Sequence, residues 1–347
     1  MTIPTTTTIG YELDVAEVIS ETADSKSFVL RPPADLRDRF DYLPGQFLTV
    51  RVPSERTGHV ARSYSLSSAP GIDDELKITV KRTTDGYASN WLCDNVLPGD
   101  RMTVLPPAGT FTHTAHDADV LLFAAGSGVT PVMSILKTAL VRSDRSVVLV
   151  YANRDRGSII FRSELEDLAA RFADRLTVHH WLDDEHGFPS VERVAAVAGD
   201  NGVREVFVCG PQPFMDMVRS GTSTAGIPAE RFHQEVFVSL TGDPFAARPA
   251  VDDSASGDAV PAVVHLDGVA HEFDWPAGQT LVDVLLGRGV DVPFSCMSGE
   301  CGSCACTVVS GKVVMNDTGI LDPADLAEGY ILGCQSRPDS GPVEIEF

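Results

Sequence analysis

Four cysteines near the end of the chain have a spacing that suits metal ligands. Cys296, Cys301, Cys304 and Cys334 form the pattern C-x4-C-x2-C-x29-C. Two irons bridged by sulfides need four thiolates around one small volume, so a tight loop supplies three and a distant segment supplies the fourth. Glycine and small residues within CMSGECGSCAC let backbone N–H groups approach the sulfur atoms. The spacing therefore predicts a plant-type [2Fe–2S] cluster.

Disulfides and structural zinc are the alternative uses of these cysteines. The first residues, MTIPTTTTIGYELDV, lack the basic start and the apolar core of a secretory signal. We therefore expect a cytoplasmic protein with free thiols rather than disulfides. A zinc ribbon would normally show a second C-x2-C pair, and none surrounds Cys334. Cys306 falls outside the pattern and is expected to be an ordinary buried thiol.

Length and charge limit the classes of function. A chain of 347 residues suggests two or three domains. The formal net charge is −22, and Val251–Phe347 contains 16 Asp and Glu against three Lys and Arg. Nucleic acid and anionic membranes are therefore poor partners, and no apolar run is long enough to span a membrane. The acidic segment has two interpretations, solubility or the steering of a basic redox partner.

The first third of the chain reads as short strands separated by turn residues. Runs such as SKSFVLRP, GQFLTVRVP and ELKITVKRT predict an antiparallel β-barrel over residues 1–114. Within it, Arg62, Tyr64 and Leu66 should share one strand face, with Ser63 and Ser65 on the other. Residues 85–92 should form a tight turn that opens a short helix. Such a helix start can bind phosphate through its N–H groups, and arginine adds bidentate charge.

Residues 115–238 alternate strands and helices, which predicts an α/β domain with a parallel sheet and ligands at the carboxyl ends of its strands. A buried strand over residues 120–125 leads into GSGVTP, which is only a partial glycine-rich loop. A later strand ends in Cys209-Gly210-Pro211. Residues 239–260 are rich in Pro, Gly, Ala, Ser and Asp and read as a linker. The cluster segment then occupies residues 261–347.

These motifs, in this order, resemble the ferredoxin–NADP reductase superfamily, in particular its oxygenase reductases with a C-terminal ferredoxin domain. That group includes the 3-ketosteroid 9α-hydroxylase reductases, which VKRTTDGYASNWLCD, HQEVFVSLTGDPF and EGYILGCQSRP resemble, and the phenylacetyl-CoA epoxidase reductases. The resemblance implies a flavin barrel, a pyridine-nucleotide domain and an α+β ferredoxin domain of the β-grasp type. It favours FAD over FMN, a point that the residues alone leave open.

The resemblance also implies roles for individual residues. Arg62 would meet the flavin pyrophosphate, Tyr64 would stack on the isoalloxazine, and Ser65 would face the reactive flavin nitrogen. The remaining flavin contacts would come from Val80, Lys81, Gly86, Ala88 and Ser89. The nucleotide contacts would come from Gly126, Gly128, Thr130, Pro131, Cys209, Gly210 and Pro211. Phe237 would cover the flavin and move aside for nicotinamide, and Glu235 with Ser65 and Cys209 would organise hydride transfer.

We expect NADH rather than NADPH as the electron donor. Arg154, Arg156 and Arg162 could meet a 2′-phosphate, but Asp155, Glu164 and Glu166 nearby would repel it. The resemblance implies that single electrons pass from NADH through FAD and the cluster to a terminal oxygenase of the Rieske or diiron kind. The diiron acyl-CoA epoxidases are the alternative partner. A redox-sensing or structural-zinc module fused to a flavin reductase is the alternative from another class.

Overall fold

The computed structural model describes residues 10–113, 118–199, 204–240, 242–246, 259–316, 320–321 and 323–347. The chain divides into two compact units. The larger unit consists of Glu12–Pro107 and Phe111–Ser239, and the smaller unit is built on Leu240–Phe347 and includes Ala108–Thr110. Within the described ranges, no helix is long and apolar enough to cross a membrane.

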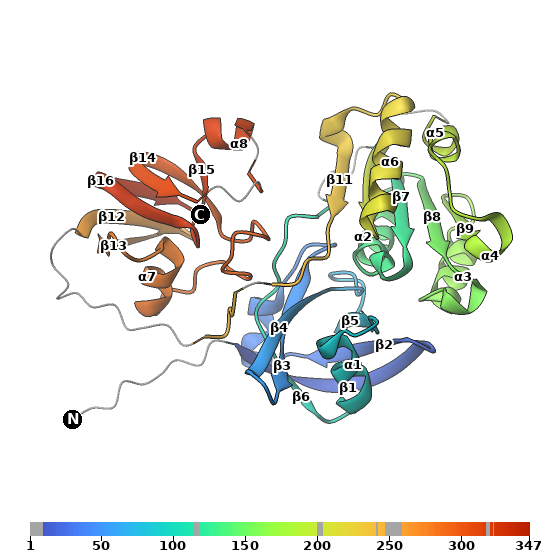
Figure 1. The fold of residues 1–347 in the computed structure, drawn as a ribbon, viewed down its shortest axis with the longest axis horizontal. Coiled ribbons are helices and arrows are strands. Elements are labelled where there is room, and N and C mark those ends of the chain that lie inside the picture. Colours follow the sequence, from blue (N-terminus) through green and yellow to red (C-terminus); the bar gives the residue numbers. More distant parts are fainter. Residues whose placement is uncertain are drawn as a thin grey trace. The chain divides into compact units, whose positions relative to one another are not determined.

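The larger unit begins with a six-stranded sheet of order β4-β3-β6-β1-β2-β5 (Figure 1). Its strands are β1 (Tyr11–Thr22), β2 (Ser25–Arg31), β3 (Phe47–Ser54), β4 (Gly58–Ser65), β5 (Leu76–Lys81) and β6 (Arg101–Val104). The pairs β1/β2, β2/β5, β3/β4 and β3/β6 are antiparallel. A bridge between Leu66 and Ile78 joins the two outer strands, so the sheet closes into the predicted barrel.

Alternating side chains explain why these segments form the barrel. In β1, Leu13 and Val15 are buried while the acidic residues between and before them face solvent. Phe28, Leu48 and Ile78 are fully buried on other strands and fill the barrel interior. The connections carry a 3-10 helix, η1 (Ala34–Phe40), between β2 and β3, and a helix, α1 (Tyr87–Asn95), between β5 and β6.

The second part of the larger unit is a five-stranded parallel sheet of order β11-β10-β7-β8-β9 (Figure 1). Its strands are β7 (Asp119–Ala125), β8 (Val147–Asn153), β9 (Leu176–Leu182), β10 (Arg204–Cys209) and β11 (Phe232–Glu235). Its α-helices are α2 (Val129–Arg142), α3 (Arg162–Arg171), α4 (Asp183–His186), α5 (Val191–Ala198) and α6 (Gln212–Thr224). The 3-10 helices are η2 (Gly126–Gly128), η3 (Arg156–Ser158) and η4 (Ala229–Arg231).

Two separate cores show which helices cover which face of this sheet. On one face, Val120 and Leu122 of β7 pack with residues of α2 and α3, such as Leu136 and Leu165. On the other face, Leu121 and Phe123 of the same strand pack with residues of α5 and α6. Because β7 is apolar on both faces, its sequence is a continuous hydrophobic run. The predicted parallel α/β fold is confirmed.

The smaller unit is a five-stranded sheet of order β13-β12-β16-β14-β15 packed with a short helix. Its strands are β12 (Ala259–Leu266), β13 (Val269–Pro276), β14 (Ala305–Met315), β15 (Tyr330–Leu332) and β16 (Ser336–Glu346), and its helices are α7 (Leu281–Gly287) and α8 (Pro323–Ala327). The terminal strand β16 lies parallel to β12 and antiparallel to β14. Trp275, Leu281 and Leu285 are fully buried in its core. The predicted order of hairpin, helix and cysteine loop is present.

Most of the predicted linker, residues 247–258 with residue 241, lies outside the described residues. Of its described residues, Ser239 ends the larger unit, residues 259–260 begin β12, and residues 242–246 belong to the smaller unit. There the side chain of Phe245 is buried, and a Cβ on Gly242 would lie 3.2 Å from the carbonyl oxygen of Cys296. The segment therefore approaches the cysteine loop at Gly242, and the spacer role of residues 239–260 stays a prediction.

Candidate functional site

A cavity of about 420 Å³ in the larger unit gathers many of the predicted site residues. Those that line it are Arg62, Tyr64, Ser65, Lys81, Gly86, Ala88, Ser89, Thr130 and Phe237. Thr79, on the same predicted flavin-lining strand as Lys81, lines it too, and the lining residues not assigned from the sequence are Ser63, Thr83, Tyr87, Ser127, Val238 and Ser239. Its volume lies in the usual range for small-molecule sites. Residues far apart in sequence, from β4, β5, α1, η2 and the segment after β11, meet there.

Strand β4 supplies both of its faces to this cavity. Arg62 and Tyr64 line it, and so do Ser63 and Ser65, although successive side chains on a strand point to opposite sides. Up to Ser65, β4 pairs with β3 alone, because the bridge to β5 begins only at Leu66, and the cavity lies along this unpaired part of its edge. Burial raises the pKa of the Tyr64 phenol, which keeps the side chain neutral. The arrangement offers a flat neutral ring beside a guanidinium.

The first turn of α1 is built to receive an anion. Asp85 and Gly86 turn the chain, Asp85 with φ 58°, and no side chain caps the helix start at Gly86. The first backbone N–H groups of a helix lack intrahelical partners, and the residues that carry them here line the cavity. A Cβ on Gly86 would lie 2.9 Å from the Cβ of Thr83, which explains the glycine. Uncapped N–H groups next to Arg62 suit a phosphate.

The strand order of the parallel sheet reverses between β7 and β10, and two glycine turns meet at that point. A Cβ on Gly128 would overlap the carbonyl oxygen of Cys209, and one on Gly210 would lie 2.9 Å from the Cβ of Ala125. Open α/β sheets bind their ligands at the carboxyl ends of the strands at such a switch point. Gly126, Gly128 and Pro131 on one turn and Cys209, Gly210 and Pro211 on the other therefore lie where the fold predicts a ligand.

Cys209 and Glu235 lie side by side at the ends of β10 and β11. Cys209 is fully buried, and burial together with the nearby Glu235 carboxylate raises the pKa of its thiol. Desolvation raises the pKa of Glu235 to about 7. Phe237, two residues further on, lines the cavity with half of its side chain exposed. The side chain of Val80 is buried in the barrel core and is absent from the cavity wall.

The arginines after β8 are held by carboxylates. Arg154 Nη2 lies 3.4 Å from Asp24 Oδ2, and Arg162 Nε lies 3.0 Å from Glu166 Oε1. Asp155 accepts hydrogen bonds from the backbone N–H and the hydroxyl of Ser158, at 2.9 and 3.0 Å. Acidic partners on two of the three arginines leave little free positive charge for a 2′-phosphate, which agrees with the expected NADH preference.

In the smaller unit the four pattern cysteines converge. Cys296, Cys304 and Cys334 are buried, and Cys301 is half-buried. Hydrogen bonding with Cys301 and then Cys334 lowers the pKa of Cys296, and hydrogen bonding with Cys334 lowers that of Cys304.

The backbone of the cysteine loop supports thiolates. The Glu300 N–H donates to Cys296 Sγ at 3.2 Å, and the Cys334 N–H donates to Cys304 Sγ at 3.4 Å. Met297, Gly299 and Gly302 have positive φ values, which the tight loop requires. No described group of three or more His, Cys, Asp or Glu is arranged around a single ion. The spacing of the four cysteines, rather than this finding, is what favours two irons that share four thiolates over one zinc ion. Cys306 stands apart, and burial raises its pKa.

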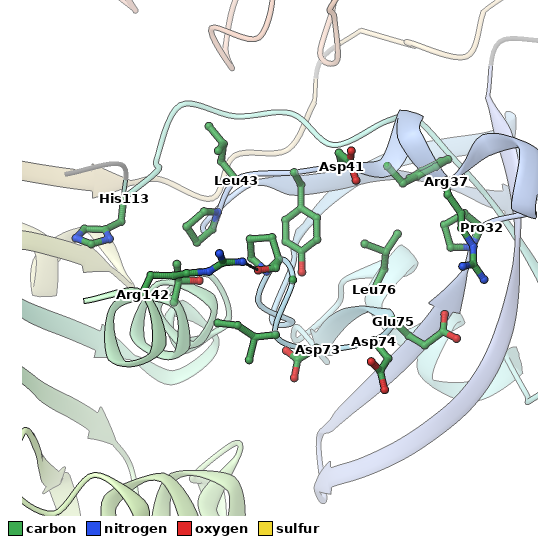
Figure 2. A pocket seen from close by; sticks show the side chains of 17 residues that line it. Pro32, Arg37, Asp41, Leu43, Asp73, Asp74, Glu75, Leu76, His113 and Arg142 are labelled. Carbon is green, nitrogen blue, oxygen red and sulfur yellow. Dashed lines mark hydrogen bonds between the residues drawn. The ribbon is translucent and has the colours of Figure 1, made fainter. Parts of the chain in front are cut away.

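A second cavity of about 860 Å³ contains none of the predicted site residues. It lies between η1, the loop before β5 and the C-terminal part of α2 (Figure 2). Arg37, Arg142, Asp41, Asp73 and Asp74 give it a mixed charge. Sequence reasoning missed it, because its walls come from loops without a motif.

Three family models match the chain. They are an oxidoreductase FAD-binding domain over residues 11–113, an oxidoreductase NAD-binding domain over residues 122–220, and a 2Fe-2S iron-sulfur cluster binding domain over residues 264–339. These matches confirm the predicted fold classes and cofactors, and the third favours an iron–sulfur cluster over the zinc alternative.

Curated relatives and solved structures match over nearly the full chain. The "3-ketosteroid-9-alpha-monooxygenase, ferredoxin reductase component" of Rhodococcus rhodochrous is 55% identical over 96% of both chains. A component of the "1,2-phenylacetyl-CoA epoxidase" of Escherichia coli is 31% identical over 98% of both. The structure of phthalate dioxygenase reductase, "a modular structure for electron transfer from pyridine nucleotides to [2Fe-2S]", is 28% identical with a TM-score of 0.56, covering 97% of this chain and 98% of that one.

Proposed function

This chain belongs to the family of monooxygenase reductase components that join FAD-binding, NAD-binding and 2Fe-2S domains, and on that basis we propose which residues perform each task. When bound, FAD takes two electrons from NADH as a hydride and releases them singly, and the [2Fe–2S] cluster carries one electron at a time. The residues of the chain hold these groups, orient them and exclude water.

The cavity along β4 holds the flavin. Arg62 and the N–H groups at the start of α1, with Gly86, Ala88 and Ser89, bind the pyrophosphate. Tyr64 offers its ring to the isoalloxazine, and Ser65, which is 4% exposed, faces the reactive nitrogen. Lys81 contributes positive charge from the end of β5. The observation that supports this assignment most is the convergence of β4, β5, α1 and the nucleotide loop on one cavity.

The crevice between β7 and β10 holds NADH. The turns at Gly126, Gly128, Thr130 and Pro131 and at Cys209, Gly210 and Pro211 bind the dinucleotide. Phe237 covers the flavin face and moves aside when nicotinamide enters. Glu235, next to Cys209 at the end of β11, would lie near the nicotinamide ring, where a carboxylate would stabilise developing positive charge. Catalysis is therefore assigned to Ser65, Cys209, Glu235 and Phe237.

Cys296, Cys301, Cys304 and Cys334 ligate the cluster, which passes electrons to a terminal oxygenase. The relative from Rhodococcus rhodochrous supports a 3-ketosteroid 9α-monooxygenase as that partner, and the Escherichia coli relative supports an acyl-CoA epoxidase as the second candidate. We place the protein in the cytoplasm, where free cysteines stay reduced. Reconstitution with each candidate oxygenase tests the partner, since hydroxylation of a 3-ketosteroid is expected only with the first.

Replacing Arg62 with alanine tests the flavin site. We expect R62A to lose FAD because the pyrophosphate loses its bidentate cation, while the cluster in the other unit stays intact. Visible absorbance of the purified protein measures both groups at once. Arg31→Ala is the matched control, because Arg31 lies in an exposed ion pair with Glu75 outside the cavity. FAD at wild-type occupancy in R62A would contradict the assignment.

A further inference from the structure

A chain of four charged side chains crosses the larger unit away from the flavin cavity. Lys137 Nζ lies 2.6 Å from Asp73 Oδ2 and 2.9 Å from Glu164 Oε1. The other oxygen of Glu164, Oε2, lies 3.0 Å from Lys77 Nζ. Charges therefore alternate in the order Asp73, Lys137, Glu164, Lys77. We call this set the ionic chain.

The ionic chain is unlike an exposed surface ion pair. The side chains of Lys137 and Lys77 are only 4% and 16% exposed, while the carboxylates of Asp73 and Glu164 are 33% and 31% exposed. Burial opposes the charge on Glu164, but Lys137 and Lys77 outweigh it and hold the pKa of Glu164 below its ordinary value. Buried ion pairs lose hydration and are weak sources of stability, whereas their directed geometry can select one arrangement of the elements that carry them.

Those elements come from both halves of the larger unit. Asp73 lies in the loop before β5 and faces the second cavity (Figure 2), and Lys77 lies on β5, both in the barrel. Lys137 lies on α2 and Glu164 on α3, both in the nucleotide-binding half. Lys77 Nζ also lies 5.2 Å from the centroid of the buried Phe161 ring, next to the start of α3. The ionic chain thus links the barrel to the nucleotide-binding half by ion pairs.

Strand β5 and helix α2 both extend from the ionic chain to the flavin cavity. Strand β5 runs on from Lys77 to Thr79 and Lys81, which line that cavity. Helix α2 starts at Val129, directly after the glycine turn, and its Thr130 lines the cavity as well. A shift of α2 against β5 would therefore move the nucleotide turn relative to the flavin-facing strand. Hydride transfer is sensitive to such shifts because the reacting atoms must approach closely.

We propose that Lys137 and Glu164 are positioning residues for hydride transfer, which hold α2 and β5 in the arrangement that aligns nicotinamide with the flavin. This inference rests on the proposed function, in which NADH reduces a flavin in the cavity along β4. Neither residue lines that cavity, so both act through the elements that carry them.

The test compares Lys137→Met with wild type in the full-length protein carrying FAD and cluster. We expect near-normal FAD content and NAD⁺ affinity, with a limiting rate of flavin reduction at saturating NADH that falls at least about tenfold. We also expect weaker long-wavelength charge-transfer absorbance when NAD⁺ is added to the dithionite-reduced protein, because that band requires stacked rings. A role in stability alone would lower the melting temperature without changing this absorbance.

Lys77→Met is the second variant, since Lys77 is more exposed and its loss leaves the contacts of Lys137 in place. It should lower the rate of flavin reduction and the charge-transfer absorbance, but by less than Lys137→Met does. If K137M does not fold, Lys77→Met alone decides the question. Arg31→Met, which breaks an exposed pair within the barrel, should change neither. Normal rates and absorbance in the folded variants would overturn the inference. Wild-type protein that NADH does not reduce would instead overturn the proposed function.

Discussion

Glu235 carries a carboxyl group whose charge is expected to change near neutral pH. Desolvation raises its pKa from 4.5 to about 7, so it becomes a carboxylate only above that pH. Nicotinamide gains positive charge as it gives up hydride, and a carboxylate stabilises that charge. Flavin reduction by NADH should therefore speed up as pH rises through about 7. In Glu235→Gln this rise with pH should disappear, and the rate should stay at the lower level. Stopped-flow absorbance measures the rate across pH 5.5 to 8.5, about 1.5 pH units to either side of neutral.

Stability provides an independent check on the same carboxyl group. A raised pKa means that the folded state holds its proton more tightly than the unfolded state, so wild-type stability falls as pH rises from 4.5 to about 7. Glu235→Gln cannot ionise and should escape that loss. Urea midpoints of the two proteins should diverge over this interval, with the variant more stable at the upper end. Parallel curves would refute the raised pKa.

Single residues were predictable where a motif fixes their type and spacing. Arg62, Tyr64 and Ser65 line the cavity, and the four spaced cysteines converge. Val80 is buried and does not line the cavity, while its neighbours Thr79 and Lys81 do, so its predicted flavin contact stays a prediction. Lys137 could not be predicted, because its importance comes from partners 64 and 27 residues away that no local pattern connects.

At the scale of elements, the turn between β7 and α2 is tested by Gly128→Ala. The added methyl group would overlap the Cys209 carbonyl, so the turn must move away from β10. Overpacking of this kind typically costs about 1–3 kcal/mol of stability. We expect weaker NAD⁺ binding with FAD content unchanged, measured by titration calorimetry. Gly278→Ala is the control, because a Cβ there meets nothing within 4 Å. Wild-type affinity in G128A would contradict the role of this turn.

Elements were easier to predict than their junctions. Period-2 burial in β1 and the two-sided apolar run of β7 specify strands from local sequence alone. The barrel closure at Leu66 and Ile78, and the second cavity between η1 and α2, depend on how distant segments meet. Proline, glycine and aspartate in residues 239–260 predict a spacer, and local composition does not predict the burial of Phe245 in the smaller unit.

For the whole molecule, the division into two units separates the capture of hydride from the delivery of single electrons. Every residue assigned to flavin and NADH belongs to the larger unit, and every assigned cluster ligand belongs to the smaller one. A substitution confined to the smaller unit should therefore leave hydride transfer from NADH to the flavin intact. The acidic surplus of Val251–Phe347 adds a long-range field to the same unit, which suits a partner with a basic surface.

Cys334→Ser tests this separation, because Cys334 is the one pattern cysteine outside the loop of residues 296–304. Without its thiolate the cluster should be lost or incomplete, since a [2Fe–2S] centre needs all four ligands. NADH-to-dye activity should persist while reduction of a one-electron protein acceptor stops. Cys306→Ser is the matched control, two residues beyond Cys304 yet outside the thiol set, and should keep both activities and the visible bands of the cluster. If C334S still delivered electrons to the protein acceptor at the wild-type rate, electrons would have to leave directly from the larger unit, and the cluster could not be their route.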